Sequence, residues 1–156
     1  FSPENSSRLP YIATAPARRP QSRDDNLGPY TAKWDYHDAT GALIACIYRY
    51  DPPEGKQYRP WDVRVRAMRM PQPRPLYRLP AVIASDPVVL VEGEKCADAL
   101  AQRGIVATTA MGGAATAIDK TDWTPLAGKT VVVWPDHDAA GERFADAVIP
   151  MLARIG

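Results

Sequence analysis

The sequence predicts an α/β protein in which a small antiparallel β-meander precedes a mostly parallel sheet flanked by helices. Three observations support this fold class. Apolar runs rich in valine occupy residues 88–91 and 131–133, and such runs are typical of strands buried on both faces of a parallel sheet. A stretch with helical spacing of apolar residues follows each run. Ahead of them, residues 30–36 and 42–50 are aromatic and β-branched and flank a short turn.

The length and composition limit the possible classes of protein. A chain of 156 residues fits one ordinary domain, or a small domain with an appended subdomain. It starts at Phe1 instead of methionine, so we expect a piece of a larger protein or a processed product. Two cysteines, Cys46 and Cys96, are too few for a cysteine zinc cage, so we expect no zinc and two reduced, buried thiols. No apolar run approaches the roughly 20 residues of a membrane span, and we expect a cytoplasmic protein without membrane contact.

The first half of the chain divides into an arm and a meander. Residues 1–29 are rich in proline and poor in large apolar side chains, so we expect an extended arm or linker. Residues 30–80 are expected to form a basic β-meander, with a hairpin closed by Asp38 and Gly41 and a third strand over residues 57–65. One face of this meander should bury Trp34, Leu43, Ile47 and Trp61, with contact to a ligand as the alternative role of Trp61.

The densest basic stretch of the chain lies between residues 56 and 80, where Asp62 is the single acid. Arg64 and Arg66 alternate with valines, so on a strand both guanidinium groups would point to one face and could follow successive phosphates. Aromatic side chains between the basic residues could stack on unpaired bases. A charged edge strand that resists aggregation is the other interpretation. The residues expected to contact nucleic acid are Lys56, Arg59, Arg64, Arg66, Arg69, Arg78 and Lys95.

Residues 81–156 alternate between strand and helix patterns, which predicts a parallel, helix-covered sheet. The run at residues 88–91 is followed by a helical pattern over residues 94–103, and residues 105–110 predict a short strand. The second valine run is followed by a helical pattern over residues 139–155, which Pro150 should kink or interrupt.

Three carboxylates follow the two valine runs. Glu92 comes directly after the first, and Asp136 and Asp138 come after the second. If the two strands are neighbours, about 4.8 Å apart, the three side chains share one crevice at the carboxyl edge of the sheet, where ligands bind in open α/β folds. Mg²⁺ prefers such oxygen ligands. The alternatives are a helix N-cap for Asp138 and a turn position for Asp136.

These motifs resemble the Toprim domain of DnaG-type primases. The resemblance is closest to phage- and plasmid-borne primase or primase-helicase proteins, and it covers roughly residues 82–156. The matching segments are Val91-Glu92-Gly93-Glu94-Lys95-x-Ala97-Asp98-Ala99-Leu100 and Pro135-Asp136-x-Asp138-x-Ala140-Gly141.

The resemblance implies a Toprim-like catalytic domain over residues 81–156. In it, Glu92 would be the acid-base or metal-bridging residue, and Asp136 and Asp138 would bind Mg²⁺, with Mn²⁺ as an alternative ion. The chain departs from the family in two ways. Primase-type sequences usually have an aspartate four residues after the glutamate, where this chain has Cys96. The chain also ends before the fourth strand that the family would lead one to expect.

The expected function is Mg²⁺-dependent nucleotidyl transfer on a single-stranded DNA template, the primer synthesis of a primase, by a fragment of a larger replication protein. Its partners would be the template, nucleoside triphosphates and a helicase domain or helicase protein. Gly112, Gly113 and Lys120 are candidates for contact with nucleotide phosphates, against the common roles of a turn and a surface lysine. Two alternatives stay open: a Toprim-type metal-dependent nuclease, and a non-catalytic nucleic-acid-binding or assembly module.

Overall fold

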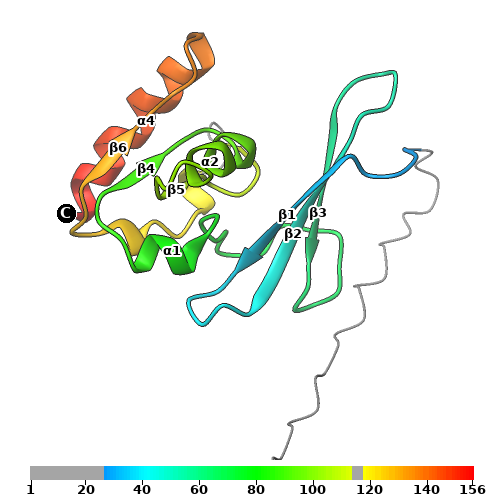
Figure 1. Cartoon of the computed structure of the whole chain (residues 1–156), viewed down its shortest axis with the longest axis horizontal. Coiled ribbons are helices and arrows are strands. Elements are labelled where there is room, and N and C mark those ends of the chain that lie inside the picture. Colours follow the sequence, from blue (N-terminus) through cyan, green and yellow to red (C-terminus); the bar gives the residue numbers. More distant parts are fainter. Residues whose placement is uncertain (1–26, 114–117) are drawn as a thin grey trace, which may run out of the picture.

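The chain forms a mixed α/β fold with two three-stranded sheets (Figure 1). The computed structural model describes residues 27–113 and 118–156. The first sheet is antiparallel with the strand order β1-β2-β3, and the second is parallel with the order β5-β4-β6. Most of the arm expected over residues 1–29 therefore lies outside the described residues.

The antiparallel sheet contains the expected meander. Its strands are β1 (Ala32–His37), β2 (Leu43–Tyr50) and β3 (Gln57–Asp62). The β1–β2 turn forms as the sequence predicts, because the Asp38 carboxylate accepts hydrogen bonds from the backbone amides of Thr40 and Ala42 and Gly41 takes a positive φ of 87°.

Two details of the predicted meander are wrong. The third strand ends at Asp62, and the chain then turns over residues 63–66, so Arg64 and Arg66 are not on a strand. The four residues expected on one face are divided between two clusters. Trp34 and Ile47 face the second sheet, whereas Leu43 and Trp61 pack with Tyr48 and Tyr50 on the opposite face.

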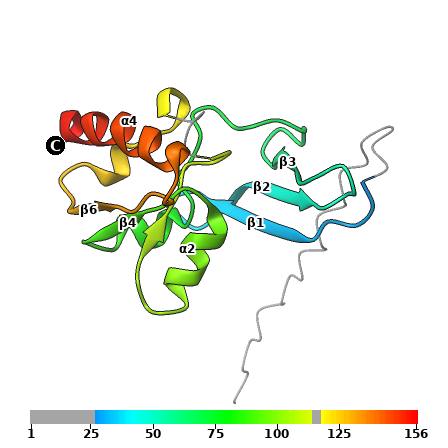
Figure 2. The same ribbon diagram turned by 90° about the horizontal axis from the view of Figure 1, so that it is seen from above.

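The parallel sheet carries helices on both faces. Figure 2 shows α4 and α2 on opposite sides of it. The elements of this part are α1 (Leu79–Ile83), β4 (Val88–Leu90), α2 (Glu94–Ala101), β5 (Ala107–Thr108), η1 (Ile118–Lys120), η2 (Thr124–Leu126), β6 (Val131–Val133) and α4 (Ala139–Ile155).

Two hydrophobic clusters hold this architecture together. One packs α4 and α1 against one face of the parallel sheet, with Leu90, Phe144 and Val148 at its centre. The other joins the antiparallel sheet to α2 and β5, through residues that include Tyr36 and Ala97. The two sheets therefore share buried apolar surface, which stabilises their relative placement.

The position of β6 differs from the prediction. The sequence predicts a strand buried on both faces, but the strand order puts β6 at the edge of the sheet. Val131 and Val133 pack against the α4 side, whereas Val132 and Trp134 are 47% and 59% exposed. The valine run predicts a strand but not its place in the sheet, because β-branched residues favour strands in general and the pairing with other strands decides whether a strand lies at the edge.

Three helix predictions also need adjustment. The sequence predicts no helix at α1, where Pro80 lies in the first turn, a position at which proline is tolerated. α2 ends at Ala101, two residues before the expected end. α4 continues through Pro150 without interruption. Within the described part of the chain, none of the helices is long and apolar enough to cross a membrane.

Candidate functional site

Glu92, Asp136 and Asp138, which we call the acidic site, lie just after the ends of β4 and β6. The two strands pair in parallel, with Leu90 opposite Val133, and the Trp134 amide donates to the Leu90 carbonyl at 2.8 Å. The chain segments that follow therefore leave the same edge of the sheet. Glu92 Oε1 accepts a hydrogen bond from the backbone amide of Asp136 at 2.7 Å. The structure thus brings together the two segments that the sequence predicts to meet.

Gly141 lets α4 approach this site closely. A Cβ atom at this position would lie 2.1 Å from the Asp136 carbonyl oxygen and 2.7 Å from Glu92 Oε1. Neither distance is sterically allowed, and the first contact is with backbone that cannot swing aside. The glycine of the Asp136-x-Asp138-x-x-Gly141 motif therefore has a packing role: it allows the first turn of α4 to sit against the Glu92 carboxylate.

Asp138 is the N-cap of α4. Its Oδ1 accepts hydrogen bonds from the amides of Ala140 at 2.9 Å and Gly141 at 2.8 Å, and its own amide donates to the Asp136 carbonyl at 2.9 Å. The structure thus contains the helix cap that the sequence left as an alternative to metal binding. A carboxylate at a helix N-terminus is also favoured by the helix dipole.

The donor set suits Mg²⁺ chemically but is not assembled into a protein cage. Among the residues that the structure describes, no group of three or more His, Cys, Asp or Glu side chains is arranged to hold a metal. Glu92 and Asp138 each use one oxygen in the hydrogen bonds above, which leaves each the other oxygen. Mg²⁺ usually binds one or two protein carboxylates and keeps several water ligands, so a site with few protein ligands is compatible with its coordination.

Cys96 lies within the electrostatic reach of the acidic site. The sequence predicts a buried thiol here, but the side chain is exposed, whereas Cys46 is buried as expected. Partial desolvation raises the pKa of the Cys96 thiol, and the charges of Asp136 and Glu92 raise it further, against the opposing effect of Lys95. The prediction failed because an exposed residue in the first turn of a helix carries no periodic signal.

The structure also contains a buried polar cluster that the sequence analysis missed. Glu94 is only 9% exposed, and its Oε1 accepts a hydrogen bond from the Tyr36 hydroxyl at 2.6 Å. One turn later, Asp98 Oδ1 accepts from the Tyr77 hydroxyl at 2.9 Å. We call these four residues the tyrosine clamp. Carboxylates at positions i and i+4 on the same helix face as the apolar Ala97 were the available signal.

The predicted nucleic-acid contacts come from several different elements of the fold. Arg64 lies in the turn after β3 and Arg69 lies shortly beyond it, and we call residues 63–69 the β3 turn. Both side chains approach the buried Asp62, at 3.6 and 3.5 Å, while about half of each is exposed. Arg66, in the same turn, is exposed and has a left-handed φ of 54°. Lys56 is exposed in the loop before β3.

The other predicted contacts lie elsewhere. Arg59 lies on β3, where its Nη2 donates to Gln57 Oε1 at 2.7 Å. Arg78 approaches Asp98 at 3.4 Å, and Lys95 is exposed in the first turn of α2, near the acidic site. The basic residues therefore divide between the loop before β3, β3 itself, the turn after β3, the N-cap of α1 and the first turn of α2.

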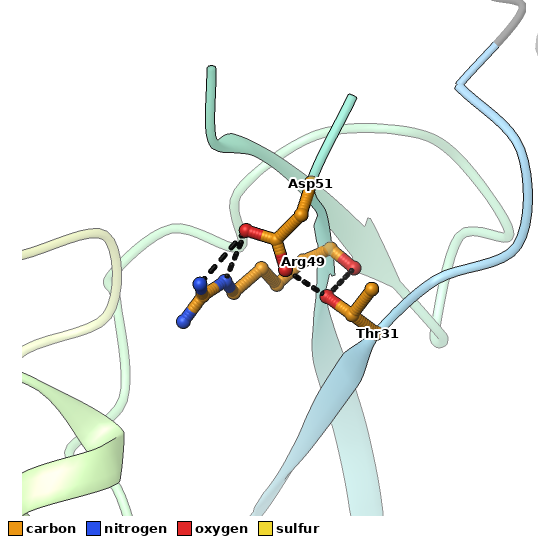
Figure 3. Close-up of polar contacts among 3 residues, drawn as sticks. All are labelled: Thr31, Arg49 and Asp51. Atoms are coloured by element: carbon orange, nitrogen blue, oxygen red, sulfur yellow. Dashed lines mark hydrogen bonds and ion pairs between the residues drawn. The ribbon is translucent and has the colours of Figure 1, made fainter. Parts of the chain in front are cut away.

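Arg49 illustrates a basic side chain whose charge is locally compensated (Figure 3). Its Nε and Nη2 atoms donate to Asp51 Oδ1 at 3.0 and 2.7 Å, and the Thr31 hydroxyl donates to the other oxygen of the same carboxylate. The hydrogen bonds from Arg49 and Thr31 lower the pKa of Asp51. Because Asp51 stays ionised beside it, Arg49 adds little to the field that a polyanion would meet.

Among the candidate phosphate contacts, the turn that holds Gly112 and Gly113 is connected to Lys120 through hydrogen bonds of Arg74. Gly112 and Gly113 have positive φ values of 91° and 86° after β5, as a glycine-rich turn requires. Arg74 lies against this turn, because its Nη1 donates to the Met111 carbonyl at 3.1 Å. The Arg74 amide also donates to the Lys120 carbonyl at 2.8 Å. The structure thus brings the backbone of Lys120 near the turn.

Comparison with protein-family models, with curated proteins and with solved structures yields no match.

Proposed function

We propose that residues 81–156 form a Toprim-like domain that catalyses Mg²⁺-dependent nucleotidyl transfer on a single-stranded DNA template. The observation that carries this proposal is the hydrogen bond between Glu92 and the Asp136 amide, at the shared carboxyl edge of β4 and β6. It joins a glutamate-glycine motif to an aspartate pair, and the helix that follows the aspartate pair approaches Glu92 closely through Gly141. The reaction would be primer synthesis within a larger phage or plasmid replication protein that includes or recruits a helicase.

Each acidic residue has a distinct part in this proposal. Asp136 and Asp138 would hold Mg²⁺, which when bound supplies positive charge to the phosphate under attack. Glu92 takes the proton of the attacking 3′-hydroxyl at the carboxylate oxygen that does not accept the Asp136 amide. Asp138 keeps its cap through Oδ1 and offers its other oxygen. Mn²⁺, which accepts the same oxygen ligands, would serve as a probe ion.

Variants that separate the helix-capping role of Asp138 from metal binding provide the most direct test. Asp138→Asn retains an oxygen for the cap and loses the negative charge, whereas Asp138→Ala loses both. We expect Asp136→Asn and Asp138→Asn each to weaken Mn²⁺ binding, followed by electron paramagnetic resonance, by about tenfold or more. Asp138→Ala should in addition lose about 1 kcal/mol of stability. If Asp138→Asn binds Mn²⁺ like the parent chain, Asp138 is a cap and not a ligand.

A primer-synthesis assay tests the reaction itself. The chain is incubated with a single-stranded template, labelled ribonucleotides and Mg²⁺ or Mn²⁺, and we expect short oligomers that disappear in Glu92→Gln. The same acids in a nuclease would activate water, so cleavage of a labelled single strand that depends on Glu92 would replace the transferase proposal with the nuclease. If neither oligomers nor cleavage products form with either ion, both enzymatic functions are contradicted.

A second candidate function is a non-catalytic nucleic-acid-binding module. The observations that favour it are the commitment of Asp138 Oδ1 to the helix cap and the presence of Cys96 where primase-type sequences usually have an aspartate. Its prediction is single-strand binding that does not change with divalent ions and is unaffected by Glu92→Gln.

The β3 turn is the proposed contact for the single strand. Arg64, Arg66 and Arg69 are exposed there. We expect Arg64→Ala with Arg69→Ala to weaken binding of a fluorescent oligonucleotide and to reduce the slope of log affinity against log salt by about 1.4. Arg49→Ala is the matched control, because Asp51 compensates its charge one to one, whereas Arg64 and Arg69 share the single carboxylate of Asp62. Equal effects of the double variant and the control would refute the contact.

A further inference from the structure

The tyrosine clamp ties α2 to the antiparallel sheet and its connector at two points. Tyr36 comes from β1 and is fully buried, and Tyr77 comes from the connector before α1. Their rings lie 5.2 Å apart at an angle of 55°, and each hydroxyl reaches a different carboxylate on the same face of α2. The clamp therefore consists of two similar hydrogen bonds, one helical turn apart.

The Tyr36–Glu94 half of the clamp is costly for a purely structural contact. Glu94 is 9% exposed, and its partner Tyr36 belongs to an apolar cluster that includes Val91, Ala97 and Met111. A buried carboxylate loses its hydration, and one hydrogen bond from a neutral hydroxyl replaces little of it. An apolar side chain of similar size would pack there without this loss. The buried Glu94 carboxylate is therefore better suited to fixing a conformation than to adding stability alone.

The conformation that Glu94 fixes extends to the backbone of Glu92. A single extended residue, Gly93, separates the two glutamates, with φ −152° and ψ 159°. The Gly93 carbonyl accepts from the amides of Cys96 at 3.1 Å and Ala97 at 3.2 Å, so this link is held by the first turn of α2. On its other side, the Glu92 carboxylate is held by the Asp136 amide and lies close to Gly141. A shift at Glu94 is therefore transmitted through one residue to Glu92.

We propose that Tyr36 and Glu94 are positioning residues that set the orientation of the Glu92 carboxylate, so that the antiparallel sheet supports the acidic site. The role in turnover rests on the proposed function, whereas the positioning itself is a property of the structure. Tyr77 and Asp98 form the matched control, since they make the same kind of hydrogen bond from the same helix one turn farther from Glu92.

The test compares Tyr36→Phe with Tyr77→Phe and uses Glu92→Gln as the reference. The Asp136 amide donates directly to Glu92, so its ¹⁵N–¹H resonance reports the position of that carboxylate without any need for activity. We expect Tyr36→Phe and Glu92→Gln to shift this resonance, and Tyr77→Phe to leave it in place. Glu94→Gln keeps an acceptor oxygen for Tyr36 and should retain most of the parent position.

Turnover and stability complete the experiment. In the primer-synthesis assay, Tyr36→Phe should lower kcat by about tenfold and leave the KM for nucleotide unchanged, and Glu94→Gln should restore kcat relative to Glu94→Ala. Urea midpoints measured in parallel show that each variant is folded. An Asp136 resonance that stays in place in Tyr36→Phe, or that moves equally in Tyr77→Phe, overturns the positioning role. A parent chain without turnover whose resonance shifts as expected instead overturns the proposed function and leaves the positioning intact.

Discussion

Glu92, Glu94 and Asp138 each accept a hydrogen bond through one carboxylate oxygen, but from different donors. Glu92 accepts from a backbone amide of the neighbouring segment, Asp138 from the first turn of its own helix and Glu94 from a buried tyrosine hydroxyl. Glu92 is half-buried and Asp138 is exposed, whereas Glu94 is only 9% exposed. Residue type alone therefore does not say what a carboxylate does in this chain, because its donor and its burial decide that.

The buried Glu94 should make stability depend on pH. Burial raises its pKa above the ordinary 4.5, against the opposing hydrogen bond from Tyr36. Between 4.5 and the raised value the folded protein binds more protons than the unfolded chain, so the free energy of unfolding falls as pH rises through that interval. Glu94→Gln removes this contribution. In urea unfolding from pH 4 to 8, the free energy of unfolding of Glu94→Gln should therefore increase relative to that of the parent as pH rises. A difference between the two that stays constant with pH would contradict the prediction.

Cys96 provides a residue-scale probe of the acidic site. Its pKa lies above the ordinary 9.0 through desolvation and the charges of Asp136 and Glu92. Glu92→Gln removes one of these charges, so the thiolate fraction and the rate of alkylation by iodoacetamide at pH 8 should increase. Cys46 should not react in the folded protein, because it is fully buried and its pKa is raised to about 12. Glu54→Gln, in the loop after β2, is the control and should leave the rate unchanged.

At the scale of elements, close approach decides where the helices sit. α4 starts at Ala139, with its cap at Asp138, and its first turn touches the end of the β6 segment through Gly141. α2 starts at Glu94, and its first turn is held by the tyrosine clamp. Both helices thus begin at the acidic site, and small changes in either first turn should be felt there.

Gly141→Ala tests the close approach of α4. Alanine is preferred over glycine in a helix by about 1 kcal/mol, which by itself would stabilise the variant. The added Cβ, however, would meet the Asp136 carbonyl oxygen at 2.1 Å. We expect this overlap to dominate and the free energy of unfolding to fall by about 1–3 kcal/mol. Thermal unfolding measures it, with Gly93→Ala as the control, since that site is extended and open. An unchanged or higher Tm for Gly141→Ala would show that the helix can move away.

At the scale of the whole molecule, the two sheets are joined by one cluster of buried side chains. Trp34, Tyr36 and Ile47 from the antiparallel sheet pack with Ala97 of α2 and Met111 beyond β5. The sequence predicts a meander followed by a catalytic domain, and the cluster runs across the boundary placed near residue 80. We therefore expect the two parts to unfold together.

Ile47→Ala tests this cooperation. Ile47 is 2% exposed, so its truncation should cost about 2–5 kcal/mol. Because the cluster is shared, far-ultraviolet circular dichroism and tryptophan fluorescence should report one coincident transition at a lower urea concentration. Ile149→Ala, at a side chain that is 51% exposed on α4, should change stability by no more than about 0.5 kcal/mol. Two separate transitions, with only one of them shifted, would show independent domains.

The sequence by itself determined the local features of this protein. Alternation and turn chemistry located the hairpin, the valine runs located β4 and β6, and the carboxylates after them located the acidic site. These features depend on residues close together in the chain, whose spacing reads out directly as strand, turn or helix.

Only the tertiary structure decided the features that depend on distant residues. It placed β6 at a sheet edge, ended β3 before Arg64, exposed Cys96 and buried Glu94 against Tyr36. Tyr36 and Glu94 lie 58 positions apart, and no local pattern encodes such a pairing. Burial and partner choice are set by which surfaces meet when the chain folds, so they appear only once the two sheets are packed together.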